Sequence, residues 1–233
     1  MGAVYRIVTL REHNRRPNQP ISEEPVVARI LAAVVALMLG ASGGALACQG
    51  KTTAAGLDET FKTPDPGWGA PDDDASFTPG GLVLKPPVNG SAWRWNPNST
   101  IDGSDLCVSV ANPSELSGRT AIGDVGVRFW AHDAQNFYTA TLSLDGTASI
   151  DRLVNGVWHV VLPPTPSGAV RTKPGAVNEV EVMVRGNTGS FFVNGAKITD
   201  FRGEPPPRGG PPGVYAESGS TAVTWVFPRV QLF

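Results

Sequence analysis

Arg128 and Trp130 stand two residues apart in a short apolar run, "VGVRFWA". Alternation along a strand places both side chains on one face together with Gly126, and places the residues between them on the other face. An indole ring can stack on the C–H face of a sugar, and a guanidinium group donates several hydrogen bonds to hydroxyl groups. The pair therefore predicts a carbohydrate-binding face of a sheet. A second interpretation stays open, in which Trp130 covers a shallow surface and Arg128 pairs with a neighbouring acid.

Three more aromatic residues are candidate ligand contacts. Trp93 and Trp95 flank Arg94, so both rings face the same side of a strand and could form an aromatic platform. Tyr138 follows the polar bend at the end of the arginine-containing run. Each of the three also fits a structural role in a sandwiched core or at its rim. The predicted ligand-binding residues are thus Arg128, Trp130, Tyr138, Trp93 and Trp95.

Three consecutive acids, Asp72, Asp73 and Asp74, offer oxygen ligands of the kind that bind calcium. Consecutive side chains do not converge on one ion without a second loop, so we expect a solvated acidic loop here. The sequence has no His/Cys cluster with zinc spacing and no G-x-S-x-G nucleophile motif. His159 is a single histidine on an apolar run beside Trp158, and we expect it to be structural. We predict no metal, no cofactor and no assigned catalytic residue.

Residues 1–47 are predicted to form a polar leader and a signal peptide. The apolar core Ile30–Leu39 follows Arg29, and Ala45–Ala47 is a cleavage site of the A-x-A type. A membrane anchor is the competing interpretation, because the apolar stretch from residue 30 to residue 47 is 18 residues long. The polar leader is long, which leaves open whether Met1 is the true start. Cleavage leaves a mature domain of residues 48–233, exported to the periplasm or secreted, that touches a membrane only if the segment is not cleaved.

The chain has two cysteines, Cys48 and Cys107, and both survive the predicted cleavage. In an oxidising compartment we expect them to form a disulfide that ties the mature N-terminus to a strand. Lipidation of Cys48 is the alternative, although Ala45 stands where a lipobox prefers leucine. Residues 48–233 hold 14 Lys and Arg against 18 Asp and Glu, and no basic run. This mildly acidic balance argues against nucleic acid and anionic membranes as partners.

The composition favours a turn-rich, all-β protein, because charged residues make up only 17% of the chain and it holds 27 Gly and 21 Pro. Short alternating apolar runs recur along residues 77–227, and Asp145-Gly146, Asn155-Gly156 and Asn194-Gly195 fall between consecutive runs. Such dipeptides favour type I′ turns, so we predict three antiparallel hairpins. The proline-rich stretches Leu162–Gly168 and Gly203–Gly213 are predicted surface loops. Ten or more strands are too many for one open sheet, so we expect two packed sheets or a barrel.

Five segments follow one another in a characteristic order: "FKTPDPGWG", "GGLVLKPP", "GVRFWAHDAQNFYTATLSLDGTASIDRLVNGVWHVV", "NEVEVMVRGNTGSFFVNGAKI" and "GGPPGVYAESGSTAVTWVFPRVQL". Together they resemble the concanavalin A-like lectin/glucanase superfamily, in particular its bacterial laminin-G-like and keto-disaccharide-hydrolase-like branches. The resemblance covers nearly all of residues 48–233. It implies an antiparallel jelly-roll sandwich of two curved sheets, with ligands on the concave face or at one rim, and a capping role for Trp68.

The resemblance also bears on catalysis. Laminarinase-type glucanases of this superfamily carry alternating acids on one strand, and the nearest stretch here is "NEVEVMV", where Glu179 and Glu181 share a face but Met183 replaces the third acid. We therefore expect an exported module that binds a carbohydrate or a cell-envelope partner without catalysis. A glycan-active hydrolase of the same superfamily and a purely structural or protein-binding module are the alternatives.

Overall fold

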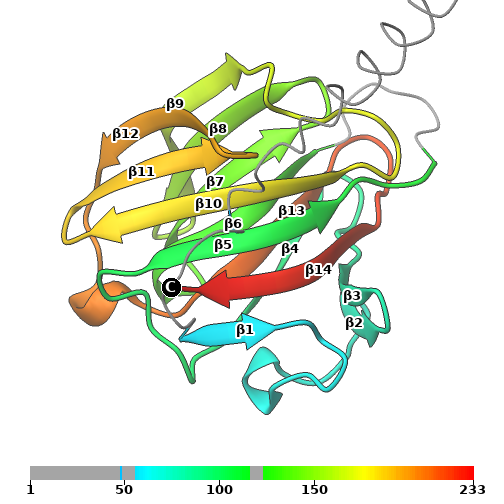
Figure 1. The fold of residues 1–233 in the computed structure, drawn as a ribbon, viewed down its shortest axis with the longest axis horizontal. Helices are drawn as coiled ribbons and strands as arrows, with labels where there is room; N and C mark the ends of the chain where they lie inside the picture. Colours follow the sequence, from blue (N-terminus) through cyan, green and yellow to red (C-terminus); the bar gives the residue numbers. More distant parts are fainter. Residues whose placement is uncertain (1–47, 49–55, 116–122) are drawn as a thin grey trace, which may run out of the picture. The chain divides into compact units, whose positions relative to one another are not determined.

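The computed structural model describes Cys48, residues 56–115 and residues 123–233. These residues form two antiparallel sheets, drawn in Figure 1. The strands are β1 (Leu57–Glu59), β2 (Ala75–Thr78), β3 (Gly81–Leu84), β4 (Gly90–Trp95), β5 (Asp105–Ala111), β6 (Asp124–Asp133), β7 (Asn136–Ser143), β8 (Thr147–Val154), β9 (Val157–Pro166), β10 (Val177–Arg185), β11 (Thr188–Val193), β12 (Ala196–Arg202), β13 (Gly213–Ser218) and β14 (Trp225–Leu232). Two short 3-10 helices, η1 (Pro66–Trp68) and η2 (Pro207–Gly209), interrupt the loops.

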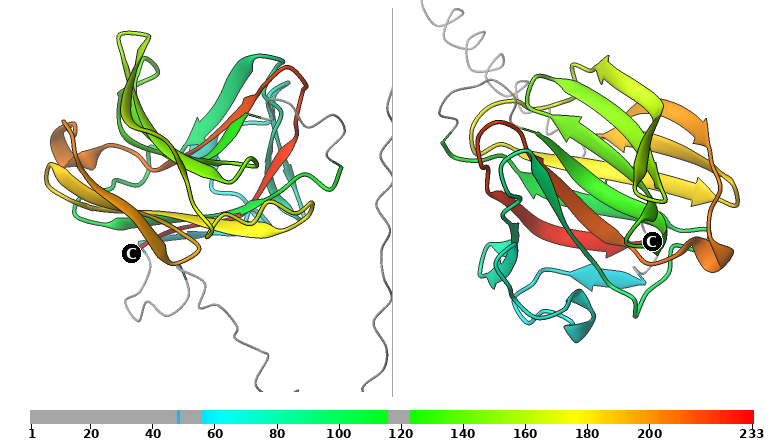
Figure 2. Two further views of the ribbon diagram at one scale, coloured as in Figure 1. Left: turned by 90° about the horizontal axis from the view of Figure 1, so that it is seen from above. Right: turned by 180° about the vertical axis from the view of Figure 1, so that it is seen from behind.

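The two sheets stack face to face as a jelly-roll β-sandwich, which confirms the predicted fold class (Figure 2). The eight-stranded sheet has the order β12-β11-β10-β5-β14-β3-β2, with β1 paired to β14. The six-stranded sheet has the order β4-β13-β6-β7-β8-β9. Every pairing is antiparallel, as the short connections and turn residues predict.

The hydrophobic core lies between the sheets and follows the period-two alternation of the strands. On β6 the side chains of Val125, Val127 and Phe129 enter it, opposite Val180 and Val182 of β10. Burial of such apolar side chains is the main favourable term in folding. Trp68 of η1 closes one part of this core, because it is 1% exposed and its ring lies 5.3 Å from that of Phe61. This position agrees with the expected capping role.

The three predicted hairpins are present as β7–β8, β8–β9 and β11–β12. Asn155 and Gly156 both have positive φ, as do Asn194 and Gly195, which is the type I′ conformation. The turn at Asp145-Gly146 differs, because among these two residues only Gly146 has positive φ. There the Asp145 carboxylate accepts a hydrogen bond from the Thr147 backbone N–H at 2.9 Å.

One predicted loop is a strand. The stretch Leu162–Gly168 was expected to lie outside the sheets, but β9 continues through its prolines to Pro166. β9 is the last strand of the six-stranded sheet, so the missing proline N–H groups fall on a strand that pairs on one side only. The other proline-rich stretch is a loop with η2 inside it, as predicted, and ends where β13 begins at Gly213.

The predicted disulfide joins Cys48 to Cys107 on β5. Both sulfur atoms are used in this bond, so Cys48 has no thiol left for a lipid. The predicted leader and signal peptide of residues 1–47 lie outside the described residues. Within the described ranges, none of the helices has the length and apolar character needed to cross a membrane.

Candidate functional site

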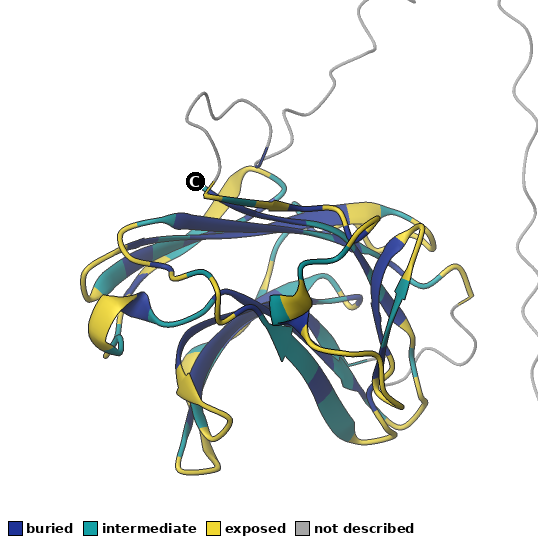
Figure 3. Cartoon of the chain, turned by 90° about the horizontal axis from the view of Figure 1, so that it is seen from below, coloured by how far each residue is buried: buried dark blue, intermediate teal, exposed yellow. Residues whose placement is uncertain are grey.

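The six-stranded sheet is strongly bent, and its outer face is concave, as Figure 3 shows. Two glycines on that face permit the bend: Gly126 of β6 and Gly213 of β13, both flanked by residues of the neighbouring strands. A Cβ atom on Gly126 would lie 2.2 Å from the Ala140 carbonyl oxygen, and one on Gly213 would lie 2.7 Å from the Arg94 carbonyl oxygen. Without side chains here, the two wings of the sheet fold toward each other.

Aromatic side chains from four strands meet on this concave face. We call Trp93, Trp95, Phe137, Trp158 and Tyr215, together with Arg128, the concave cluster. The rings of Trp93 on β4 and Phe137 on β7 have centroids 5.9 Å apart, although β13 and β6 lie between their strands. Trp158 packs edge-on against Phe137 at 5.6 Å and against Tyr215 at 6.0 Å. Phe137 and Tyr215 are buried, whereas Trp93 and Trp95 are half-buried and Trp158 is exposed.

Arg128 lies inside this cluster. Its guanidinium carbon is 3.9 Å from the centre of the Trp95 ring and 4.2 Å from the centre of the Phe137 ring, a cation held by two aromatic faces. Nη2 donates to the backbone oxygen of Asp133 at 2.6 Å. Nε and Nη1 are buried and have no hydrogen-bond partner. Burial lowers the pKa of Arg128 to about 9, and the charge of Asp133 offsets only part of this shift.

The structure places Trp130 and Tyr138 on the opposite side of the sheet, so the alternation predicted for β6 is wrong at its end. Trp130 has φ 46°, and the pairing of β6 with β7 shifts between Phe129 and Asp133. This β-bulge turns Trp130 inward beside Phe129. Both Trp130 and Tyr138 belong to the core between the sheets, where their rings lie 5.3 Å apart.

Trp130 and Tyr138 nevertheless line a hollow at one rim of the concave face. We call it the rim hollow. It has a volume of about 440 Å³ and lies between the β6–β7 turn, β8 and residues 204–207. Phe137 and Leu153 contribute to it and also to the apolar side of the concave face. The rim hollow therefore adjoins the concave cluster.

Three carboxyl groups from three strands also lie on the concave face: Asp124 of β6, Asp151 of β8 and Glu217 of β13. Burial and the charge of Glu217 raise the pKa of Asp124 to about 7, and the same causes raise the pKa of Asp151. Tyr215 donates a hydrogen bond to the Glu217 carboxylate, and burial together with that carboxylate raises the pKa of Tyr215. The raised pKa values indicate that these carboxyl groups are partly desolvated and repel one another.

The acids considered from the sequence lie elsewhere. Glu179 and Glu181 share the outer face of β10, as predicted, but that face belongs to the eight-stranded sheet. Glu179 accepts a hydrogen bond from the Cys48 backbone N–H at 3.1 Å, which gives it a structural role. In the acidic loop, Asp72 accepts hydrogen bonds from two backbone N–H groups and pairs with Arg94. Among the described residues no group of His, Cys, Asp or Glu is arranged to hold a metal ion.

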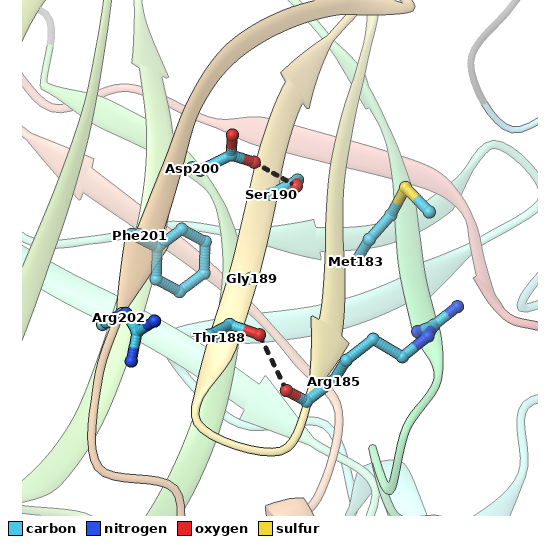
Figure 4. Close-up of a pocket in the computed structure, with 8 residues that line it drawn as sticks. All are labelled: Met183, Arg185, Thr188, Gly189, Ser190, Asp200, Phe201 and Arg202. Atoms are coloured by element: carbon cyan, nitrogen blue, oxygen red, sulfur yellow. Dashed lines mark hydrogen bonds between the residues drawn. The ribbon is translucent and has the colours of Figure 1, made fainter.

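A further hollow lies on the outer face of β10, β11 and β12, shown in Figure 4. Its volume is about 550 Å³. Several polar groups that line it already bond one another: Ser190 donates to Asp200 at 2.5 Å, and Thr188 donates to the Arg185 carbonyl oxygen at 2.9 Å. Arg185 pairs with Asp105 at 2.8 Å. This face therefore offers less free hydrogen-bonding capacity than the concave one.

Comparison with solved structures identifies the fold. Carbohydrate-binding module CBM66 from Bacillus subtilis matches with a TM-score of 0.51 and 17% identity, over 68% of this chain and 89% of that chain. Beta-glucanase of Bacillus licheniformis matches with a TM-score of 0.53 and 13% identity, over 78% of this chain and 99% of that chain. The carbohydrate recognition domain of Emp46p in its potassium-bound form matches with a TM-score of 0.53 and 12% identity, over 75% of this chain and 94% of that chain. The chain shares the jelly-roll β-sandwich fold of these proteins. No family model and no curated protein matches the sequence.

The sequence predicted only part of the site on the concave face. It placed Trp93 and Trp95 on one face and included Arg128, and the structure brings these three together. It missed Phe137, Tyr215 and Trp158, which come from three other strands. Alternation gives the face of each residue within a strand, but the order of the strands decides which residues meet across the sheet. The tyrosine in "GVYAES", two residues after a strand-opening glycine and two before an acid, was the available signal for Tyr215 and Glu217.

Proposed function

We propose that this protein is an exported module that binds a carbohydrate on the concave face of its six-stranded sheet and does not transform it. The observation that carries the proposal is the concave cluster. Trp93, Trp95 and Trp158 offer partly exposed ring surface over a floor of buried aromatic side chains. Aromatic faces stack on the C–H groups of sugars, while neighbouring polar groups bond the hydroxyl groups.

Two further observations support this proposal. The buried guanidinium of Arg128 keeps two N–H groups without partners, and a buried donor without a partner is costly in free energy unless something compensates it. The solved structures with the same fold include a carbohydrate-binding module and a carbohydrate recognition domain. The disulfide accords with export of residues 48–233 as the mature domain, because such bonds persist in oxidising compartments.

A binding experiment with one substitution tests the proposal. Wild-type protein is titrated with soluble neutral polysaccharides in affinity gels and on a glycan array, and then compared with Trp158→Ala. We expect binding to fall about tenfold, because one aromatic contact contributes on the order of 1 kcal/mol. Since Trp158 is 44% exposed, stability should change little. Val177→Ala is the matched control, with an apolar side chain 40% exposed on the other sheet. Absence of wild-type binding across the panel would sink the proposal.

A second candidate function is hydrolysis of a glycan, which the concave carboxyl groups favour. Asp124, with a pKa of about 7, suits a general acid at neutral pH, and Glu217 offers a second carboxyl group on the next strand. Turnover of any polysaccharide that is lost in both Asp124→Asn and Glu217→Gln would favour it over binding alone. Binding without turnover, retained in both variants, favours the module. A purely protein-binding module predicts a partner from the cell envelope and no affinity for sugars.

A further inference from the structure

We infer that the rim hollow is a second subsite that binds an acidic sugar residue, with the sugar carboxylate taking the place of Glu204 on Arg152. This inference rests on the proposed function, since the rim hollow extends the concave cluster through Phe137 and Leu153. Its volume of about 440 Å³ falls within the range of small-ligand sites. Phe137 belongs to both places, so the hollow and the concave cluster adjoin at the rim of the sheet.

The hollow combines an aromatic lining with one guanidinium. Trp130, Phe137 and Tyr138 contribute to the lining, and the Arg152 guanidinium carbon lies 5.2 Å from the centre of the Tyr138 ring. The Tyr138 hydroxyl accepts a hydrogen bond from the Glu204 backbone N–H at 3.0 Å, which fixes the edge of the hollow. Arginine in this setting binds a carboxylate through parallel N–H donors, a geometry that neutral hydroxyl groups do not reproduce.

Arg152 already holds a carboxylate that a ligand can replace. Its Nη2 lies 2.6 Å from Oε2 of Glu204, whose side chain is 77% exposed on the proline-rich segment. A pair this exposed contributes little stability, about 0–1 kcal/mol. Displacing the Glu204 side chain from Arg152 therefore costs little free energy. The position of the Glu204 carboxylate marks where the carboxylate of a ligand would bind. Glu204 is thus an internal competitor for the ligand carboxylate.

The other charged groups of the hollow are already engaged. The Asp133 carboxylate accepts hydrogen bonds from the Gln135 backbone N–H at 2.7 Å and from Asn136 Nδ2 at 2.9 Å, and it lies 3.3 Å from His132 Nδ1. These contacts hold the Asp133 carboxylate within the β6–β7 turn. Arg152 is consequently the cation best placed to bind an incoming carboxylate.

The test compares uronic-acid oligosaccharides with their carboxyl-reduced, neutral counterparts by calorimetric titration of the full chain. Oligomers of galacturonate, glucuronate and mannuronate serve as probes. We expect at least one acidic oligomer to bind about tenfold more tightly than its neutral counterpart, since a charge-assisted hydrogen bond is worth on the order of one power of ten. The preference should shrink as salt is added, because ions screen exposed charges.

Two variants separate the roles of the ion pair. Arg152→Gln should lose the preference for the acidic oligomer and keep binding of the neutral one. Glu204→Gln should bind the acidic oligomer more tightly than wild type, because the competing carboxylate is gone. Arg229→Gln is the matched control, since Arg229 pairs with Asp58 at 2.6 Å on the other sheet. Thermal unfolding of each variant verifies that it is folded.

The outcomes separate the two proposals. Equal binding of acidic and neutral oligomers, or a preference that survives in Arg152→Gln, would overturn the second subsite and leave the proposed function standing. Affinity for neither kind of oligomer would also overturn the second subsite, and the proposed function would then be decided by the panel of neutral polysaccharides alone. A gain for acidic oligomers in Glu204→Gln, absent for neutral ones, is the result that a merely structural ion pair does not produce.

Discussion

Arg128 is a buried cation, and the charge of Asp133 offsets only part of its loss of water. Two of its N–H groups have no partner, and two aromatic rings cover the guanidinium. Burying a charge in this way costs solvation free energy, and the contacts with the two aromatic rings offset only part of that cost. We therefore expect that the charge of Arg128 adds little to the stability of the fold.

Substitution of Arg128 tests this conclusion. In Arg128→Met an apolar side chain of similar length fills the same volume, so the free energy of unfolding should stay equal or rise. Arg128→Ala leaves a cavity beneath Trp95 and should lose about 2–5 kcal/mol. Urea unfolding measures both. If the methionine variant is as unstable as the alanine variant, the charge itself stabilises the fold and the conclusion fails.

Asp124 makes stability depend on pH. Its carboxyl titrates near pH 4 in the unfolded chain and at about 7 in the folded protein. Because the folded-state pKa is the higher one, the protonated form favours folding. The contribution is complete below about pH 4 and is lost as the pH rises to 7. Asp151, whose pKa is also raised, acts in the same direction.

The measurement is thermal unfolding of the wild type and of Asp124→Asn between pH 5 and pH 8. The wild type should lose melting temperature over this range, whereas the neutral asparagine should lose less. The two curves should therefore approach each other at the acidic end. Parallel curves across the whole range would show that Asp124 titrates normally.

At the scale of elements, the sequence predicted strands and hairpins better than it predicted which side chains meet. Asn155-Gly156 and Asn194-Gly195 fix their turns locally, since both residues of each pair accept positive φ. The bulge at Trp130 depends instead on packing against Tyr138 of the next strand and against Phe201, which comes from a distant part of the chain. Strand β9 includes prolines because it is an edge, a fact of topology that a local pattern does not contain.

Gly126 offers a test of the bend in the six-stranded sheet. In Gly126→Ala the added methyl group meets the Ala140 carbonyl oxygen at 2.2 Å, so the strands must shift. We expect a loss of about 1–3 kcal/mol in the free energy of unfolding, the usual range for overpacking, and weaker glycan binding. Gly168→Ala is the control, because nothing lies within 4 Å of its added Cβ atom. Equal stability of both variants would contradict this account of the curvature.

At the scale of the whole molecule, the disulfide joins the start of the described domain to the middle of the eight-stranded sheet. Cys48 and Cys107 are 59 residues apart. Closing a loop of this length lowers the entropy of the unfolded chain and stabilises the fold by about 4 kcal/mol. The double variant Cys48→Ser/Cys107→Ser should have a free energy of unfolding lower by about that amount, seen as a lower urea midpoint. An unchanged midpoint would show that the bond does not constrain the unfolded state.

The central claim is that the concave face of the six-stranded sheet binds a glycan, and the indole N–H signals of the six tryptophans test it most directly. Proton–nitrogen NMR spectra are recorded while an oligosaccharide that binds the protein is titrated in. We predict that the indole N–H signals of Trp93, Trp95 and Trp158 shift. The signals of Trp68 and Trp225, which are buried in the core, should stay unchanged. Saturable binding that leaves the three concave tryptophans unshifted would contradict the account.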